Sequence, residues 1–304
     1  MKNILSQRAN ELKPSATLAI SAKEKELRSQ GVDVVGFGAG EPDFPTPAHI
    51  REAAKRSLDR GETFYTPVGG TVELKKAIMK RLSEDYALDY KPEHILVSCG
   101  AKHSLYNIFQ AIIGDGDEVL IPAPYWVSYP EMVCLSGGKP VIVPSQEKRN
   151  FEPEPELMES LITPKTKAII INSPSNPTGI MYSNKALEEI AQVARKHDLI
   201  VISDEIYDKL VYDNLNFTAF ASLPGMLERT ITVNGVSKTY AMTGFRIGYL
   251  ATPLTEIVKA ATNIQSQSTS NPAGTAQAAA VEALSGPQEE VGKMRDIFEK
   301  RRNL

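Results

Sequence analysis

Short apolar segments rich in β-branched residues alternate with amphipathic helical segments through most of this chain, and that alternation restricts the fold more than any other feature. The strand-like segments are residues 94–97, 118–121, 141–143, 167–171, 199–203, 230–233 and 246–251. Strands that are apolar along their whole length are typical of a sheet buried on both faces. We therefore expect an α/β fold in which helices cover both faces of a mostly parallel sheet, in three layers.

Helical periodicity fills most of the sequence between and after these segments. The expected helices are residues 15–30, 47–59, 72–87, 102–113, 127–135, 185–197, 276–284 and 288–302. Ser15 is expected to cap the first of them and Gly31 to end it. Sheets of this kind bind ligands beyond the carboxyl ends of their strands, so the loops that follow the strands are the expected place for a site.

Composition excludes several classes of partner. The 304 residues include 34 Lys plus Arg and 37 Asp plus Glu, for a net charge of −3, so no polybasic surface for nucleic acid or anionic membrane is expected. The apolar stretches are too short to span a bilayer, and residues 1–14 lack a signal-peptide core. Cys99 and Cys134 have no metal-ligand spacing. We expect a soluble, cytoplasmic protein of enzyme size that binds no metal.

Two of the loops that follow strands carry polar or small residues. Residues 98–102 lie at a strand-to-helix junction, where small residues expose backbone N–H groups and the helix dipole favours phosphate. The alternative is an ordinary strand-to-helix turn. Residues 172–179 hold two prolines that stiffen the loop and present Asn176 in a fixed place. The alternative there is a turn that is only rigid.

Two further loops carry charges that are costly to bury. Asp204 directly follows an apolar strand, where a carboxylate needs a partner unless it merely caps the next element. Lys238 follows another strand, and Arg246 comes eight residues later. An anion between these two cations would offset their repulsion, although Lys238 as a solvated surface residue is the alternative.

Taken together, the four loops describe one ligand, pyridoxal 5′-phosphate. Its phosphate needs cations and N–H groups, its ring nitrogen a carboxylate, its phenolic oxygen an Asn or Tyr, and its aldehyde a lysine. The cofactor forms a Schiff base with that lysine, and an acid that keeps the pyridine nitrogen protonated makes the ring an electron sink.

Six motifs resemble the class I/II aminotransferases of fold type I, and most closely the bacterial aspartate aminotransferases. They are GAGEPDF (38–44), FYTPVGG (64–70), PYWVSYPEM (124–132), NSPSNPTG (172–179), SDEIY (203–207) and SKTYAMTGFRIGY (237–249). They extend through most of the chain in the family's order, which chance does not explain.

The resemblance implies a role for each matching residue around the cofactor. Lys238 would be the Schiff-base lysine and proton shuttle, and Asp204 the partner of the pyridine nitrogen. Asn176 and Tyr207 would hold the phenolic oxygen, and Trp126, the only tryptophan, would stack on the ring unless it is simply a core residue. The residues expected around the phosphate are Gly100, Ala101, Lys102, Ser237 and Arg246.

The same resemblance implies an assembly and contacts with substrate. Tyr65 would reach the phosphate of a neighbouring subunit, which makes a homodimer part of the site. Gly40 would lie beside the substrate carboxylate. Trp126 and Asn176 would also contact substrate.

The implied reaction is ping-pong transfer of the amino group of L-aspartate to 2-oxoglutarate. Lys238 must be neutral to act as its base, and both desolvation and Arg246 would lower its pKa. Lys102, Ser15 and Thr17 would bind the distal carboxylate of aspartate, although Lys102 as an exposed first-turn lysine is the alternative.

Other activities stay open at this point. Aspartate/prephenate aminotransferase is the main alternative, with Lys13 in a position to help. Another aminotransferase or a carbon–sulfur lyase of the same fold type would share the cofactor residues. A cofactor-sensing regulator would need a DNA-binding domain for which the chain has no spare length. A dinucleotide site is excluded because Glu41 stands where its third glycine belongs.

The resemblance also implies two domains. Residues 46–285 would form the large cofactor domain, and residues 1–45 and 286–304 would belong to a smaller one. Family members continue beyond Leu304 with a segment whose arginine binds the α-carboxylate of the substrate. We therefore expect an incomplete small domain, and a chain that holds the cofactor but transaminates weakly.

Overall fold

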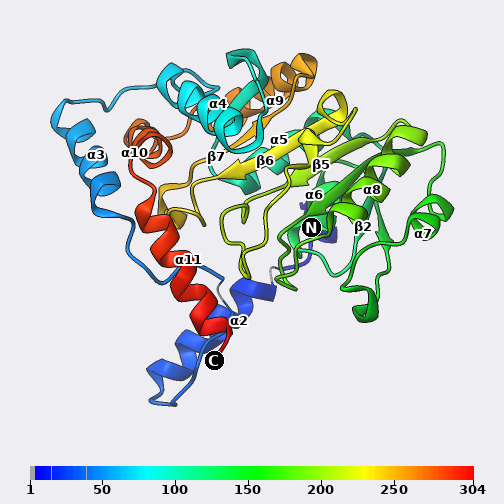
Figure 1. Cartoon of the computed structure of the whole chain (residues 1–304), viewed down its shortest axis with the longest axis horizontal. Helices are drawn as coiled ribbons and strands as arrows, with labels where there is room; N and C mark the ends of the chain where they lie inside the picture. Colours follow the sequence, from blue (N-terminus) through cyan, green and yellow to red (C-terminus); the bar gives the residue numbers. More distant parts are fainter. Residues whose placement is uncertain (1–3, 15, 39) are drawn as a thin grey trace.

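A seven-stranded sheet forms the centre of the computed structural model, which describes residues 4–14, 16–38 and 40–304 (Figure 1). The strands are β1 (Ile95–Ser98), β2 (Glu118–Pro122), β3 (Lys139–Val143), β4 (Thr166–Asn172), β5 (Ile200–Asp204), β6 (Thr230–Gly235) and β7 (Gly248–Ala251). Their order is β1-β7-β6-β5-β4-β2-β3. Only β7 pairs antiparallel, with β1 and with β6. The expected α/β fold with a mostly parallel sheet is confirmed.

Helices connect the strands and continue after them. The described helices are α1 (Gln7–Glu11), α2 (Ala16–Ser29), α3 (Ala48–Asp59), α4 (Val72–Tyr86), α5 (Ala101–Ile112), α6 (Ser128–Leu135), α7 (Pro155–Ser160), α8 (Asn184–Lys196), α9 (Thr255–Ser268), α10 (Gly274–Ser285) and α11 (Glu289–Arg302). No helix in the described ranges is long and apolar enough to cross a membrane. The cytoplasmic location stays a prediction.

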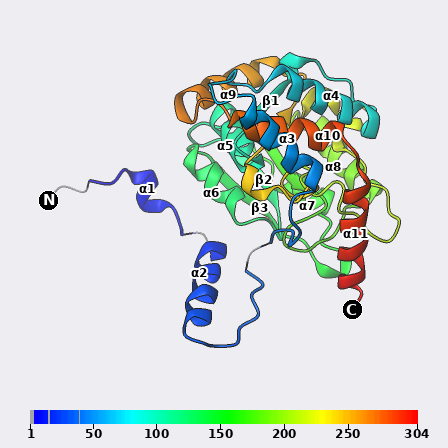
Figure 2. The ribbon, with the colours of Figure 1, turned by 90° about the vertical axis from the view of Figure 1, so that its left-hand side faces the viewer.

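Strand β4 shows how the sheet forms the middle of three layers. Ala168 and Ile170 pack in one apolar cluster with α5, α6 and α9, whereas Ile169 and Ile171 pack in another with α7 and α8. A third cluster joins β1 and β7 to α3, α4 and α10. Figure 2 shows α1 and α2 extending away from these layers. The apolar strands are thus buried on both faces, as their composition predicts.

One expected strand begins later than predicted. Residues 246–251 read as a strand, but β7 begins at Gly248, and Arg246 instead ends a short 3₁₀ helix with φ +55°. A Cβ on Gly248 would overlap the backbone of Ala101, so β7 passes directly against the first residue of α5. This close approach leaves Arg246 beside the start of α5 rather than within the sheet.

Glu205, the first residue after β5, is buried. Its side chain is 1% exposed, and its Oε1 accepts hydrogen bonds from Ser203 Oγ (2.8 Å) and from the backbone N–H of Phe220 (3.0 Å). Oε2 has no partner among the described residues. Burial raises the pKa of Glu205 to about 8, so the folded protein holds this carboxyl protonated at neutral pH.

The substitution Glu205→Gln should therefore make stability less dependent on pH. The unfolded wild-type chain releases this proton near pH 4.5 and the folded chain near pH 8, so the wild type loses stability as the pH rises between these values. Relative to wild type, the variant should gain roughly 2–4 kcal/mol between pH 5 and pH 8. Urea unfolding at both pH values measures this difference, and parallel pH profiles would contradict it.

Candidate functional site

The carboxyl ends of β4 and β5 meet at a pair of polar residues. Asn172 and Asp204 are the last residues of these strands and lie in register. The side-chain amide of Asn172 donates to the backbone oxygen of Asp204 (2.9 Å), and its Oδ1 accepts from the backbone N–H of Asn176 (2.7 Å). Asn172 therefore fixes the loop that carries Asn176 against the end of β5.

The Asp204 carboxylate lies in an almost fully buried position, 4% exposed. Tyr129 Oη donates to Oδ2 (2.6 Å), and the backbone N–H of Ile206 donates to Oδ1 (3.3 Å). Burial raises the pKa of Asp204 to about 6, while these two hydrogen bonds and the charge of Lys238 pull it down. The carboxylate is therefore charged at neutral pH and able to accept a further proton donor.

Tyr207 and Asn176 lie together next to this carboxylate. Burial, and then the charge of Asp204, raises the pKa of Tyr207 to about 12, and a hydrogen bond with the Asn176 side chain lowers it in part. Lys238 Nζ lies 5.8 Å from the centre of the Tyr207 ring. The structure thus brings the predicted partners of the cofactor ring to one place.

Lys238 is half-buried and stands between opposite charges. Its ammonium donates to the backbone oxygen of Gly40. Burial has the largest effect on the Lys238 pKa and lowers it; Arg246 lowers it further, whereas Glu41 and Asp204 oppose the shift. The net result is an amine that loses its proton more readily than an ordinary lysine, as a catalytic base requires.

Backbone contacts hold Arg246 at the start of α5. Its Nη1 donates to Thr243 O (3.0 Å) and its Nη2 to Cys99 O (3.4 Å). Gly100 has φ +89°, and a Cβ there would lie 2.5 Å from Arg246 Nη2. Glycine is therefore required for the guanidinium to approach the helix end, where the first N–H groups have no partner within the helix.

Three cations gather around this helix end. Lys102 Nζ lies 4.7 Å from the Trp126 ring centre, and desolvation and the charge of Arg246 lower the Lys102 pKa. Arg246 also acts on Lys238, as described above. Within residues 4–14, 16–38 and 40–304, none of these three cations forms an ion pair with a carboxylate. Like charges held together at a helix N-terminus indicate a site for an anion.

Several predicted residues lie elsewhere or outside what is described. Ser15 falls outside the described residues, and Thr17 lies half-buried in α2. Tyr65 is 91% exposed, and Ser237 is buried next to Lys238. Lys13 donates its backbone N–H to Glu131 of α6 (3.3 Å). Only Ser237 of these lies among the residues brought together by the strand ends.

The sequence prediction missed two residues of the site, Tyr129 and Asn172. Tyr129 is 2% exposed and its ring lies edge-on to Trp126, with centres 5.4 Å apart. Both residues lie inside the aminotransferase-like motifs, Tyr129 three residues after Trp126 and Asn172 four residues before Asn176. An aromatic hydroxyl eight residues after the expected strand end at residue 121 was the available signal, because a buried carboxylate needs donors.

Replacing Tyr129 by Phe should raise the pKa of Asp204 above its present value of about 6. The variant loses the 2.6 Å hydrogen bond that stabilises the charged form, while the ring packing remains. The carbon-13 shift of labelled aspartate carboxyls, followed against pH, measures the change. Tyr125→Phe is the matched control, and an unchanged Asp204 titration in Tyr129→Phe would contradict the assignment.

Comparison with known proteins gives the family. The model of aminotransferase class I and II matches residues 32–304. An aspartate aminotransferase of Bacillus subtilis is 52% identical over 300 residues, covering 98% of this chain and 76% of the relative. An aspartate/prephenate aminotransferase of Cereibacter sphaeroides is 50% identical, covering 99% and 75%. The structure of Thermus thermophilus aspartate aminotransferase with maleate superposes with a TM-score of 0.95 at 45% identity, covering 98% and 78%. The chain belongs to the class I and II aminotransferase family.

Proposed function

We propose that this protein is an aspartate aminotransferase, which transfers the amino group of L-aspartate to 2-oxoglutarate in a ping-pong reaction that uses pyridoxal 5′-phosphate. The observation that carries the proposal is a half-buried lysine, Lys238, coupled to a buried carboxylate, Asp204, and to the guanidinium of Arg246. These are the three groups that an aldehyde, a ring nitrogen and a phosphate on one ligand require.

The site residues fit pyridoxal phosphate. Lys102 and Arg246 repel each other at the start of α5, so a dianionic phosphate there would offset their repulsion. Gly100, Ala101, Lys102, Ser237 and Arg246 are the residues proposed to hold it. The charged Asp204 would hold the proton of the ring nitrogen.

The remaining contacts with the ring come from neighbouring loops. Asn176 and Tyr207, which already bond to each other, would hold the phenolic oxygen. Trp126, placed by its contacts with Lys102 and Tyr129, would cover the ring face. When bound, the cofactor supplies an electron sink for the α-carbon of the amino acid.

The chemistry left to this chain is proton transfer and orientation. Lys238 would remove the proton from the α-carbon of the substrate and carry it to the cofactor, so that one amine would serve first as base and then as acid. Its lowered pKa makes the neutral amine available near pH 7. Gly40, whose backbone oxygen accepts a hydrogen bond from the Lys238 ammonium, is proposed to lie beside the substrate carboxylate.

Aspartate is the preferred donor for two reasons. Relatives that are about half identical over nearly the whole chain bear the name aspartate aminotransferase. The Thermus structure holds maleate, a four-carbon dicarboxylate. Lys102 is the cation proposed for the distal carboxylate, and Ser15 and Thr17 are proposed to contact the same carboxylate. Because other relatives are named aspartate/prephenate aminotransferase, prephenate is the second candidate acceptor.

A homodimer is part of the proposal. Phe64 and Tyr65 are 84% and 91% exposed, and an aromatic pair so open to solvent favours burial against a partner. Gln277 of α10 fixes the adjoining loop, donating to Thr66 Oγ1 (2.9 Å) and accepting from the N–H of Thr71 (2.8 Å). We propose that Tyr65 reaches the phosphate site of a second copy.

Contacts between the chain ends support the proposed small domain. Phe44 packs edge-on against Phe298, with ring centres 5.2 Å apart, and Arg301 donates to both carboxylate oxygens of Asp43 (2.8 and 3.0 Å). Residues 43–44 therefore contact α11, as members of one unit would. Residues 46–285 form the proposed cofactor domain.

Lys238→Ala should abolish covalent capture of the cofactor and lower transamination of aspartate at least about a hundredfold, because the variant has no amine at this position. Borohydride reduction followed by peptide mapping should label Lys238 in the wild type and nothing in the variant. Keto-acid release from aspartate measures the reaction.

Lys185 provides a matched control, since Lys185→Ala removes a lysine whose side chain is 85% exposed and pairs with Glu189 on the same helix. A label at another lysine, or aspartate turnover that survives in Lys238→Ala, would overturn the assignment. Offering cystathionine instead of aspartate separates a carbon–sulfur lyase from a transaminase, and arogenate, the amino product of prephenate, tests the second candidate.

Lys102→Met distinguishes a substrate contact from a phosphate contact. If Lys102 binds the distal carboxylate, kcat/KM for aspartate should fall about tenfold to a hundredfold, as loss of a charged hydrogen bond predicts, while kcat/KM for alanine and cofactor affinity stay unchanged. Lys102→Arg, which keeps the charge, is the control. Equal losses for aspartate and alanine would assign Lys102 to the phosphate alone.

A further inference from the structure

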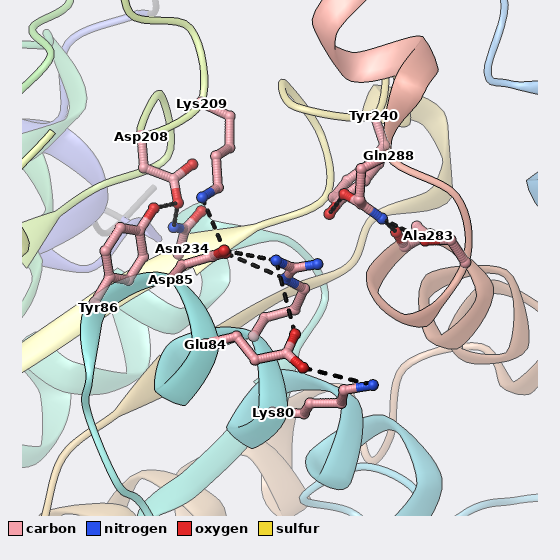
Figure 3. Close-up of polar contacts among 12 residues, drawn as sticks. Lys80, Glu84, Asp85, Tyr86, Asp208, Lys209, Asn234, Tyr240, Ala283 and Gln288 are labelled. Carbon is pink, nitrogen blue, oxygen red and sulfur yellow. Dashed lines mark hydrogen bonds and ion pairs between the residues drawn. The ribbon is translucent and has the colours of Figure 1, made fainter. Parts of the chain in front are cut away.

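Asp208 follows Tyr207 directly and is a buried acid to which the proposed chemistry gives no part. Its side chain is 8% exposed. The backbone N–H of Asp208 bonds to Glu205 O (3.0 Å) and that of Leu210 to Tyr207 O (2.8 Å), so the segment after β5 is a compact turn. The carboxylate of Asp208 points away from this turn, towards α4 and β6 (Figure 3).

The carboxylate accepts hydrogen bonds from three different segments. Tyr86 Oη, on the last residue of α4, donates to Oδ2 (2.6 Å), and Asn234 Nδ2, on β6, donates to the same oxygen (3.0 Å). Thr239 Oγ1 donates to Oδ1 at 3.4 Å, a longer and weaker contact. Thr239 is the residue after Lys238, and Tyr207 is the residue before Asp208.

The partner on β6 is itself held in place. Asn234 Oδ1 accepts from the backbone N–H of Gly235 (2.7 Å), and Gly235 lies opposite Gly248 in the ladder with β7. Asn234 is therefore a rigid donor at the strand end that leads into Ser237 and Lys238. The Asp208 carboxylate, which is bound to Asn234, is therefore held at a fixed distance from residues 237–238.

An ion pair next to Asp208 joins the turn to α4, in addition to the hydrogen bond from Tyr86. Burial raises the pKa of Asp208, whereas the Tyr86 bond, Lys209 and the Asn234 bond lower it, and Asp85 raises it. Lys209 pairs with Asp85 (2.9 Å), which also binds Arg81 (2.6 Å). Figure 3 shows Lys209 and Asp208 reaching α4 side by side, on Asp85 and Tyr86.

We propose that Asp208 is a positioning residue, whose carboxylate holds the segment carrying Tyr207 against the segment carrying Lys238. The inference rests on the proposed function. The hydrogen bonds to Asn234 and Thr239 set where the amine of Lys238 lies relative to the Tyr207 ring, while the bond to Tyr86 keeps Asp208 from turning away. Asp208 itself touches no reacting atom.

Asp208→Ala leaves Tyr86, Asn234 and Thr239 without their shared acceptor. Pyridoxal phosphate should then bind about tenfold more weakly, as loss of buried hydrogen bonds predicts, and the pH midpoint of the absorbance change of bound cofactor should shift. Asp208→Asn keeps the volume and one carbonyl acceptor, so it should show a smaller shift in the same direction and remains informative if Asp208→Ala does not fold.

Ile190→Ala is the control for general destabilisation. Ile190 is buried in α8, in the cluster with α7, and its truncation costs stability without touching the turn or β6. If either Asp208 variant loses thermal stability like Ile190→Ala while its cofactor affinity and absorbance midpoint match wild type, Asp208 is only structural and the inference is wrong. If the wild type itself takes up no pyridoxal phosphate, the proposed function fails, and this inference fails with it.

Discussion

The burial of one carboxylate at the end of a central strand is the constraint on which the rest of the site depends. Asp204 remains charged only because Tyr129 and a backbone N–H donate to it and because Lys238 lies nearby. Tyr129 comes from α6, Ile206 from the turn after β5 and Lys238 from the segment after β6. These segments must therefore converge at the carboxyl edge of the sheet before the acid is tolerated there, and that convergence forms the site.

Most of the fold follows from the sequence because the strands are apolar on both faces. No polar residue interrupts residues 168–171, and the expected strand 167–171 matches β4 to within one residue at each end. The predicted start of β7 at residue 246 was wrong. Arg246 and Ile247 read as part of the strand, but β7 begins at Gly248, which lies against the first residue of α5. A packing contact between segments far apart in the chain has no local signal.

The sequence predicts those site residues whose charges are costly to bury, namely Asp204, Lys238 and Arg246. The structure brings these three together with Asn176, Tyr207 and Lys102. Tyr129, Asn172 and Asp208 were not expected, because their groups are satisfied by partners on other elements and nothing in their local sequence shows this.

The contact of Gly100 and Gly248 with Arg246 and α5 has a consequence for how the anion site responds to change. At Gly248 the close neighbour is the main chain at the start of α5, and at Gly100 it is the Arg246 guanidinium, which two backbone carbonyls already hold. A guanidinium fixed in this way loses little side-chain entropy when an anion enters. The cost is evolutionary, because neither position accepts even a methyl group without moving the guanidinium or the helix.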